Sequence, residues 1–473
     1  MTVIFSQEGE VKMGLLDVFV LTVYFAALMT VGIIGTKKAK TSEMYMVAGR
    51  NLGVFMFFGC LTAVFLGGSS TIGTAQLGYE NGVSGVWFVF SMGLGIMLFG
   101  LLLYKRVTGY QLMTISEFLG KRFNTGAKLI GATVAAIYAL MVSVTQVIAI
   151  GSILNAVFGW DLTVSMLVGG GIVFFYTVLG GMWSVSMTDI IQFSVMTVGI
   201  FFVMLPFSLS KAGGWGQLTT QLPSAFFDFS AIGFMEIVQY ILLYTLGMMV
   251  GQDIWQRYFT AKNINVARTG GILVGVYSLI YSLAMCVIGM CAVIVLPDIE
   301  NTQNVFSLMA FETLPSGLLG IVFAAVASAI MSTASGTLLA SSTLIAKDIL
   351  KDHFFQNISD QQFLFISRVT TLAAGTAAIA IALWIQELLV AMDVAYAVLA
   401  GSIFVPIVLG MFWKKVTPKA AFYAITSSAI VVLITLALEG FSSNHPILYG
   451  IATNIVVMTA VSWIDSSRSK ISA

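Results

Sequence analysis

The sequence predicts an all-α polytopic membrane protein with about thirteen transmembrane helices. Of its 473 residues, 58% are hydrophobic and only 9% are charged, whereas a soluble domain keeps about 25% charged residues. Long uncharged apolar runs recur from end to end, and the basic residues gather in alternate connections. We therefore expect one membrane domain over 1–473, embedded in a lipid bilayer, with no soluble domain and no nucleic-acid partner.

Each of the thirteen apolar runs is near the roughly 20 residues that a span needs. The first run is expected to be a peripheral helix, and 418–464 is expected to hold two more. The ten between them divide into spans 2–6 at 52–209 and spans 7–11 at 233–413, so the first group through span 7 covers about 52–254. In chain order the runs are 14–36, 52–78, 83–104, 126–154, 163–180, 186–209, 233–254, 269–297, 316–346, 366–386, 390–413, 418–438 and 447–464.

The basic residues orient these spans. With thirteen spans, twenty of the 22 Lys and Arg residues fall on one side, which the positive-inside rule assigns to the cytoplasm. Only Lys12 and Lys211 fall on the other side. We therefore expect the amino terminus outside and the carboxyl terminus in the cytoplasm, in a plasma membrane of the bacterial inner-membrane type.

Few residues could carry enzymatic chemistry. Cys60, Cys286 and Cys291 lie in apolar runs without metal-ligand spacing, which is typical of buried thiols. His353 and His445 lie in polar connections. The sequence has no evident nucleophile–base pair or metal cluster, so we expect a protein that is not an enzyme.

Span 2 contains "FLGGSST", which sets poor helix formers and small polar residues inside an apolar run. Backbone groups in hydrocarbon must be paired, so a broken helix survives there only where it lines a cavity or is buried in protein. A break exposes carbonyl oxygens that bind cations and N–H groups that bind anions. The alternative is close helix packing through small residues.

Two further segments favour the break. Span 7 contains Gly247 and Gly251, and paired interruptions in two repeats mark the binding site of inverted-repeat transporters. Span 9 places Ser332 and Ser335 on one face with Thr333 beside them. Hydroxyls and carbonyls supply oxygen to sodium without net charge, so the ion can leave again. The alternative is that these hydroxyls bond to their own helix.

Asp189, at the cytoplasmic start of span 6, is a further candidate. An acid near or inside the bilayer is a functional-site candidate. It could instead be a helix amino-terminal acid that the macrodipole favours.

The chain resembles the sodium:solute symporter family over nearly its whole length. That resemblance implies a LeuT-type fold, in which spans 2–11 form a 5+5 inverted-repeat core, and alternating access driven by a sodium gradient. The motifs that carry it are "GGSSTIGTAQLGYENG", "ISEFLGKRF", "YTVLGGMWSVSMTDIIQ", "GQDIWQRYF", "SAIMSTASGTLLASSTLIAKDI" and "SIFVPIVLGMFWKKVTPKAA".

The resemblance also implies a sodium site. Its ligands would be the carbonyls of Ala63, Leu66 and Ala329 with the hydroxyls of Ser332 and Thr333.

Some family members hold a second sodium, which here would lie at Asp189, Ser332 and Ser335. Two-sodium members carry another serine where this chain has Gly336. Asp189 could instead lie on the ion's inward exit route.

By the same resemblance, the solute pocket lies beside the ion and between the two breaks. The fourth span lacks the arginine of sialic-acid-like members, and Thr245 and Met249 replace the aromatics of proline-like members. An amino acid, a monocarboxylate and a neutral solute all remain open, and we expect the chain to act as a monomer. The candidate pocket residues are Phe65, Ser69, Ser70, Trp87, Gln146, Tyr244 and Met248.

The sequence thus predicts a sodium-coupled importer of a small organic solute. The nearest alternative is a proton-coupled symporter of the same fold. A solute-sensing membrane protein and a channel are alternatives from other classes.

Overall fold

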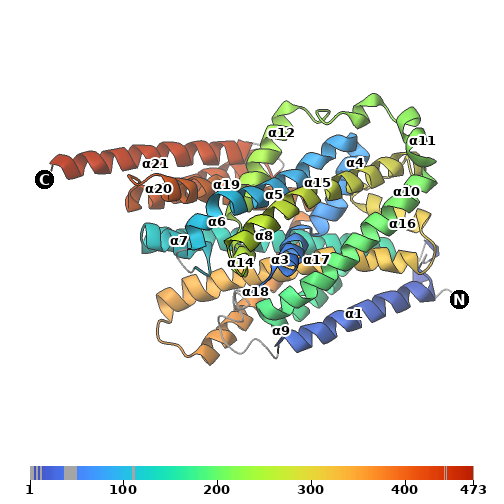
Figure 1. The fold of residues 1–473 in the computed structure, drawn as a ribbon, viewed down its shortest axis with the longest axis horizontal. Helices are drawn as coiled ribbons and strands as arrows, with labels where there is room; N and C mark the ends of the chain where they lie inside the picture. Colours follow the sequence, from blue (N-terminus) through green and yellow to red (C-terminus); the bar gives the residue numbers. More distant parts are fainter. Residues whose placement is uncertain are drawn as a thin grey trace.

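The computed structural model describes residues 5–6, 9–10, 13–36, 51–108, 112–441, 443 and 445–471. Most of the long helices run along the long axis of the molecule, with α1 beginning at one end and α21 finishing at the other (Figure 1). The basic residues Lys37, Lys38, Lys40 and Arg50 lie outside the described residues. Ahead of α1, two-residue strands β1 and β2 pair antiparallel.

The first half of the chain contains β1 Phe5–Ser6, β2 Gly9–Glu10, α1 Leu15–Thr36, α3 Val54–Phe65, η2 Ser69–Gly73, α4 Thr74–Asn81, η3 Gly82–Gly85, α5 Val86–Leu98, η4 Phe99–Leu103, α6 Tyr104–Val107, α7 Ile115–Arg122, α8 Thr125–Phe158, α9 Leu162–Thr197, η6 Val198–Met204, α10 Leu205–Lys211, α11 Gly214–Gln221 and η7 Ser224–Phe227. The second half contains α12 Phe234–Tyr240, η8 Ile241–Thr245, α13 Leu246–Val250, α14 Gln252–Tyr258, α15 Ile264–Val295, η9 Thr302–Asn304, α16 Val305–Thr313, α17 Leu318–Thr343, η10 Leu344–Phe354, α18 Asp360–Ile385, α19 Leu388–Phe412, α20 Pro418–Glu439 and α21 His445–Ile471.

Both predicted interruptions are present. In span 2, α3 ends at Phe65, and Leu66 and Gly67 are not helical before the chain resumes toward η2. In span 7, Gly251 has extended backbone angles, and the helical stretches on either side of it meet at 48°. The backbone groups freed at these breaks are buried in protein, where an interrupted helix is tolerated.

The predicted count of thirteen spans is not confirmed. Among the described residues, nine helices are long and apolar enough to cross a membrane, or ten if the bent pair around Gly251 is one span. Shorter apolar helices at Leu15–Val31, Val54–Phe65 and Leu162–Phe174 coincide with spans 1, 2 and 5. The connection predicted at 181–185 is helical within α9, because its apolar sequence contains no proline to end a helix.

The helix α17 forms the centre of the molecule. It packs against α8, α9, α1, α18 and α3, and every side chain from Val322 to Thr343 is buried. Small residues let the helix backbones approach each other. The helices α4 and α15 also approach closely at a small residue, because a Cβ on Gly78 would lie 2.5 Å from the Cys286 carbonyl oxygen.

The "ISEFLGKRF" motif forms α7, which connects several helix ends. Thr114 and Glu117 make a capping box at its start, and Ser116 Oγ donates to Asp348 Oδ2 of η10 at 2.7 Å. Arg122 Nε donates to the Gly410 carbonyl of α19 at 2.8 Å. Burial alone would raise the pKa of the Glu117 carboxyl, but the Lys347 ammonium and the backbone N–H groups of Met113 and Thr114 together hold that pKa below its ordinary value.

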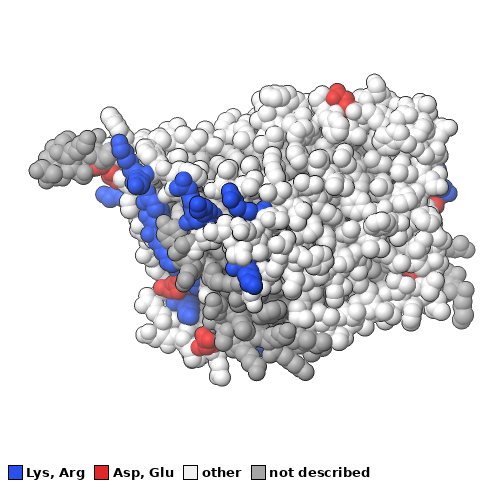
Figure 2. Space-filling view, in the orientation of Figure 1, with Lys and Arg blue, Asp and Glu red and all other residues white. Residues whose placement is uncertain are grey.

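The charges are unevenly distributed over the surface. On the face shown in Figure 2, Lys and Arg gather toward the end that carries α6, α7 and α20, and most of the remaining surface is uncharged. At the other end, Lys211 pairs with Glu312 at 3.1 Å. On this face the Lys and Arg residues thus lie mainly toward one end, which is the kind of asymmetry that the sequence predicts.

Candidate ion and solute site

Oxygen atoms from α3 and α17 meet at the first break. Ser332 Oγ donates to the Ala63 carbonyl at 2.6 Å and also approaches the Ala329 carbonyl at 3.1 Å. Thr333 Oγ1 lies 3.5 Å from the Ala63 carbonyl oxygen. All four residues are buried, with at most 3% of their surface exposed. The structure therefore brings together four of the five predicted sodium ligands.

The fifth predicted ligand, Leu66, is the C-cap of α3, directly after the last helical residue. The next residue, Gly67, approaches α17 and α8 so closely that a Cβ would lie 2.6 Å from Thr333 Oγ1 and 2.7 Å from Gln146 Oε1. Only glycine fits this approach without moving one of those side chains. The chain at the break is thus packed against both the Thr333 hydroxyl and the Gln146 amide.

Gln146 caps the half of the broken helix that follows the break. Its Oε1 accepts a hydrogen bond from the Gly68 N–H at 2.8 Å, and its Nε2 donates to Thr145 Oγ1 at 2.7 Å. A side-chain acceptor at this position satisfies one of the N–H groups that a helix start leaves unpaired. Gln146 therefore fixes the geometry of the break.

The serines after the break face methionines. Ser70 Oγ donates to the Phe65 carbonyl at 2.9 Å across the break and lies 3.8 Å from Met92 Sδ. Ser69 Oγ lies 3.7 Å from Met392 Sδ of α19. Phe65, Ser69 and Ser70 are thus assembled at one place beside polarizable side chains that adapt to different solutes.

Tyr244 and Met248 lie on the half of span 7 that precedes its break at Gly251. The Tyr244 hydroxyl donates to Asp393 Oδ1, and the Tyr396 hydroxyl approaches Met248 Sδ at 3.5 Å. Both contacts join span 7 to α19. Trp87 Nε1 donates to the Phe229 carbonyl at 2.8 Å in the connection before α12.

Asp189 forms a buried ion pair with Arg257 of α14. Arg257 Nη2 lies 3.0 Å from Asp189 Oδ2, and the two side chains are 1% and 0% exposed. Ser335 Oγ donates to the Ser332 carbonyl of its own helix at 3.1 Å. A Cβ on Gly336 would lie 3.2 Å from Arg257 Nη2 and would overlap Val64. The position beside Asp189 is therefore taken by a guanidinium.

The sequence reading missed three charged residues of this region. It counted Arg257 among the cytoplasmic loop cations and gave no role to Asp253 or Asp393. Asp253 Oδ1 accepts from the Tyr138 hydroxyl at 3.1 Å, which in turn lies 3.1 Å from the Tyr396 hydroxyl. The position of Asp253 and Asp393 inside predicted spans was the signal that could have found these two acids.

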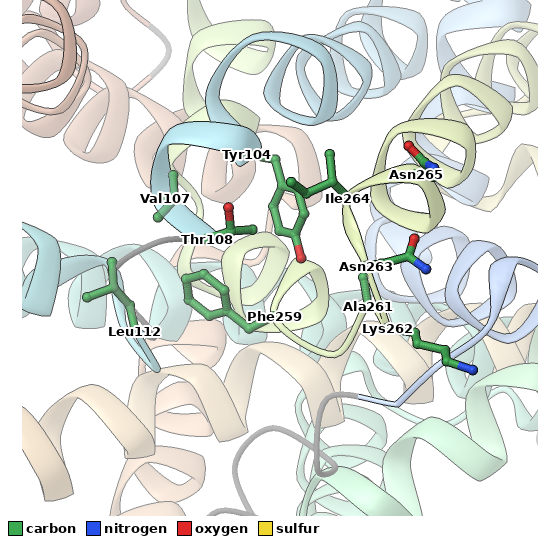
Figure 3. A pocket seen from close by; sticks show the side chains of 10 residues that line it. All are labelled: Tyr104, Val107, Thr108, Leu112, Phe259, Ala261, Lys262, Asn263, Ile264 and Asn265. Atoms are coloured by element: carbon green, nitrogen blue, oxygen red, sulfur yellow. The ribbon is translucent and has the colours of Figure 1, made fainter.

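One cavity in the described part of the chain lies away from both breaks. It has a volume of about 660 Å³, and none of the predicted site residues line it. Figure 3 shows the Tyr104 and Phe259 rings beside it and Lys262 extending away. Its lining residues are Tyr104, Val107, Thr108, Leu112, Phe259, Ala261, Lys262, Asn263, Ile264 and Asn265. The same described residues hold no group of three or more His, Cys, Asp and Glu that could bind a metal ion.

Comparison with known proteins identifies the family. A sequence profile described as the sodium:solute symporter family matches residues 45–427. The chain belongs to this family. The sodium:solute symporters are transporters, and this member is a sodium-coupled symporter of a small solute in the plasma membrane.

Relatives of this symporter match over nearly their whole length. The osmoregulated proline transporter of Bacillus subtilis is 26% identical in an alignment 475 positions long, which covers 96% of this chain and 95% of the relative. A sodium/proline symporter of Staphylococcus aureus is 27% identical in an alignment 484 positions long, which covers 95% of this chain and 92% of the relative.

Solved structures of symporters show the same fold. A substrate-bound, outward-open Na⁺-coupled sialic acid symporter superposes with a TM-score of 0.81 at 20% identity, covering 95% of this chain and 98% of that chain. A closed nucleobase-cation-symport-1 family transporter superposes with a TM-score of 0.58 at 14% identity, covering 89% and 95%. The predicted LeuT-type fold is thereby confirmed.

Proposed function

We propose that this symporter binds one sodium ion at the break in span 2. The ligands are the carbonyls of Ala63, Leu66 and Ala329 and the hydroxyls of Ser332 and Thr333. The supporting observation is that Ser332 bridges the α3 and α17 carbonyls within 2.6 and 3.1 Å. Unwound carbonyls beside helix hydroxyls are the donors that bind sodium in broken-helix transporters.

The ion and the solute are coupled through the break. Thr333 and Gln146 both contact the space at Gly67, so an ion that holds Thr333 also fixes the start of the half-helix that follows the break. Phe65, Ser69 and Ser70 of the solute pocket flank the break, so their positions depend on its geometry. A solute then binds well only to the sodium-loaded state, which is the condition for coupling.

One ion supplies enough free energy for uptake. Sodium entry through 100 mV releases about 2.3 kcal/mol, and a tenfold gradient adds about 1.4 kcal/mol. The sum, about 3.7 kcal/mol, supports roughly 500-fold accumulation of solute. We assign no second sodium to Asp189, Ser332 and Ser335, because Arg257 already neutralises Asp189.

The solute pocket lies between the two breaks and includes Phe65, Ser69 and Ser70 on one side and Tyr244 and Met248 on the other. Gln146 shapes the pocket through its hydrogen bond to Gly68. The relatives named for proline make a small amino acid the first candidate solute. The chain acts as a monomer in this proposal, since all these residues come from one chain.

Sodium selectivity tests this function. Purified protein should show a saturable increase in melting temperature in NaCl relative to KCl or choline chloride at equal ionic strength, because an ion that binds only the folded state stabilises it. Once a solute is identified, a sodium gradient across proteoliposomes should drive its accumulation without a pH gradient. Equal stabilisation by all three salts, with uptake driven by a pH gradient, would favour the proton-coupled alternative.

The proposed orientation has the amino terminus outside and the carboxyl terminus in the cytoplasm of the bacterial inner membrane. The three native cysteines are buried, so single exposed cysteines can be introduced at Ala231 and Gln356. We expect a membrane-impermeant maleimide to label Ala231→Cys in intact cells and Gln356→Cys only after permeabilisation. The reverse pattern would invert the topology.

A further inference from the structure

Asp393 is an acidic residue inside the predicted span 11. It lies in the second turn of α19 and is only partly buried. The Tyr244 hydroxyl donates to it, and the Tyr244 ring lies 5.7 Å from the ring of Tyr240, which follows Glu236 by one turn of α12. Met392, next to Asp393, contacts Ser69 directly after the first break. Asp393 therefore borders the proposed solute pocket.

Asp393 has no cationic partner among the described residues. Its hydrogen-bond donor is the Tyr244 hydroxyl, and the ion pairs of the described residues do not include it. Lys211 is engaged with Glu312. A carboxylate within a membrane span is costly and normally has a functional partner. The missing partner is a positive charge.

Aromatic rings cluster around Tyr244, the hydrogen-bond donor of this carboxylate. The Tyr244 ring lies 4.9 Å from Phe88, 5.1 Å from Tyr396 and 5.7 Å from Tyr240, between ring centroids. Tyr396 is three residues from Asp393 and so lies on the same face of α19. Aromatic faces attract cations, and groups of them recognise ammonium ligands. The rings and the carboxylate thus both favour a ligand with a positively charged nitrogen.

We propose that Asp393 and these rings receive a protonated or quaternary nitrogen of the transported solute. The inference rests on the proposed function and narrows its substrate class to amines, amino acids and betaines. A monocarboxylate would meet Asp393 as a like charge, and a neutral solute would leave Asp393 without a counter-charge.

The test is solute binding to the purified full-length chain, measured by melting temperature in NaCl. The probes are proline, glycine betaine and putrescine, with lactate as the monocarboxylate and inositol as the neutral solute. We expect at least one nitrogen compound to stabilise the wild type and neither lactate nor inositol to do so. Asp393→Asn should weaken that binding by about tenfold or more, whereas Asp393→Glu and Tyr244→Phe, which keep the charge or the ring, should weaken it less.

Glu312→Gln is the matched control, because it removes an acid that pairs with Lys211 and should leave binding unchanged. Stabilisation by sodium alone reports the ion site and shows that each variant is folded. Its absence in the wild type would count against the proposed function, independently of this inference. Stabilisation by lactate or inositol, no stabilisation by any nitrogen compound, or equal affinity in Asp393→Asn would overturn the inference.

Discussion

Arg257→Gln should severely destabilise the protein, and Asp189→Asn should do the same. Each substitution removes one charge of the 3.0 Å pair while the other side chain of that pair stays buried. Breaking a buried ion pair from one side costs about 3–5 kcal/mol, because the remaining charge stays desolvated. The amount of monodisperse protein after detergent extraction and its melting temperature measure the effect.

The double variant Asp189→Asn/Arg257→Gln shows whether the loss of stability comes from the broken ion pair. With both charges removed, we expect most of the lost stability to return, since replacing both partners is often neutral. Glu312→Gln is again a matched control, because the exposed Lys211–Glu312 pair should contribute less than about 1 kcal/mol. Arg257→Gln protein as stable as the wild type would show that the pair does not hold α9 and α14 together.

Ser332→Ala and Thr333→Ala should each raise the sodium concentration for half-maximal stabilisation or uptake by about tenfold or more. The physical reason is the loss of one oxygen ligand, and a tenfold change corresponds to about 1.4 kcal/mol. Solute affinity measured at saturating sodium should change less, because these hydroxyls act on the solute through the break.

Ser342→Ala is the control on the same helix. Its hydroxyl donates to the Leu339 carbonyl of α17 at 3.1 Å, so its loss should leave sodium dependence unchanged. If Ser332→Ala and Thr333→Ala behave like Ser342→Ala, the hydroxyls pack the helix and do not bind the ion.

The membrane fold and the two breaks could be predicted from local sequence. Apolar runs determine the spans, and the run of small residues at Gly67 and Gly68 marks a position where the chain can leave the helix. The break matters because Gly67 contacts Thr333 and Gln146, which are distant in sequence. A pattern within one helix predicts such a break, but it does not show which side chains will meet there.

The partners of the charged residues could not be predicted in this way. Arg257 follows the second break by six residues and was counted as a loop cation, yet it is buried against Asp189 of α9. The hydrogen-bond donor to Asp393 is likewise distant in sequence, because Tyr244 lies 149 residues away. The helical connection at 181–185 shows that apolar composition locates spans better than it locates their ends.

Equilibrium binding of radioactive sodium to the purified chain, without solute, tests the central claim most directly. The account predicts saturable binding of about one ion per chain, competed by unlabelled sodium but not by potassium, and lost in the Ser332→Ala/Thr333→Ala double variant while Ser342→Ala binds normally. Undiminished sodium binding by the folded double variant would contradict it.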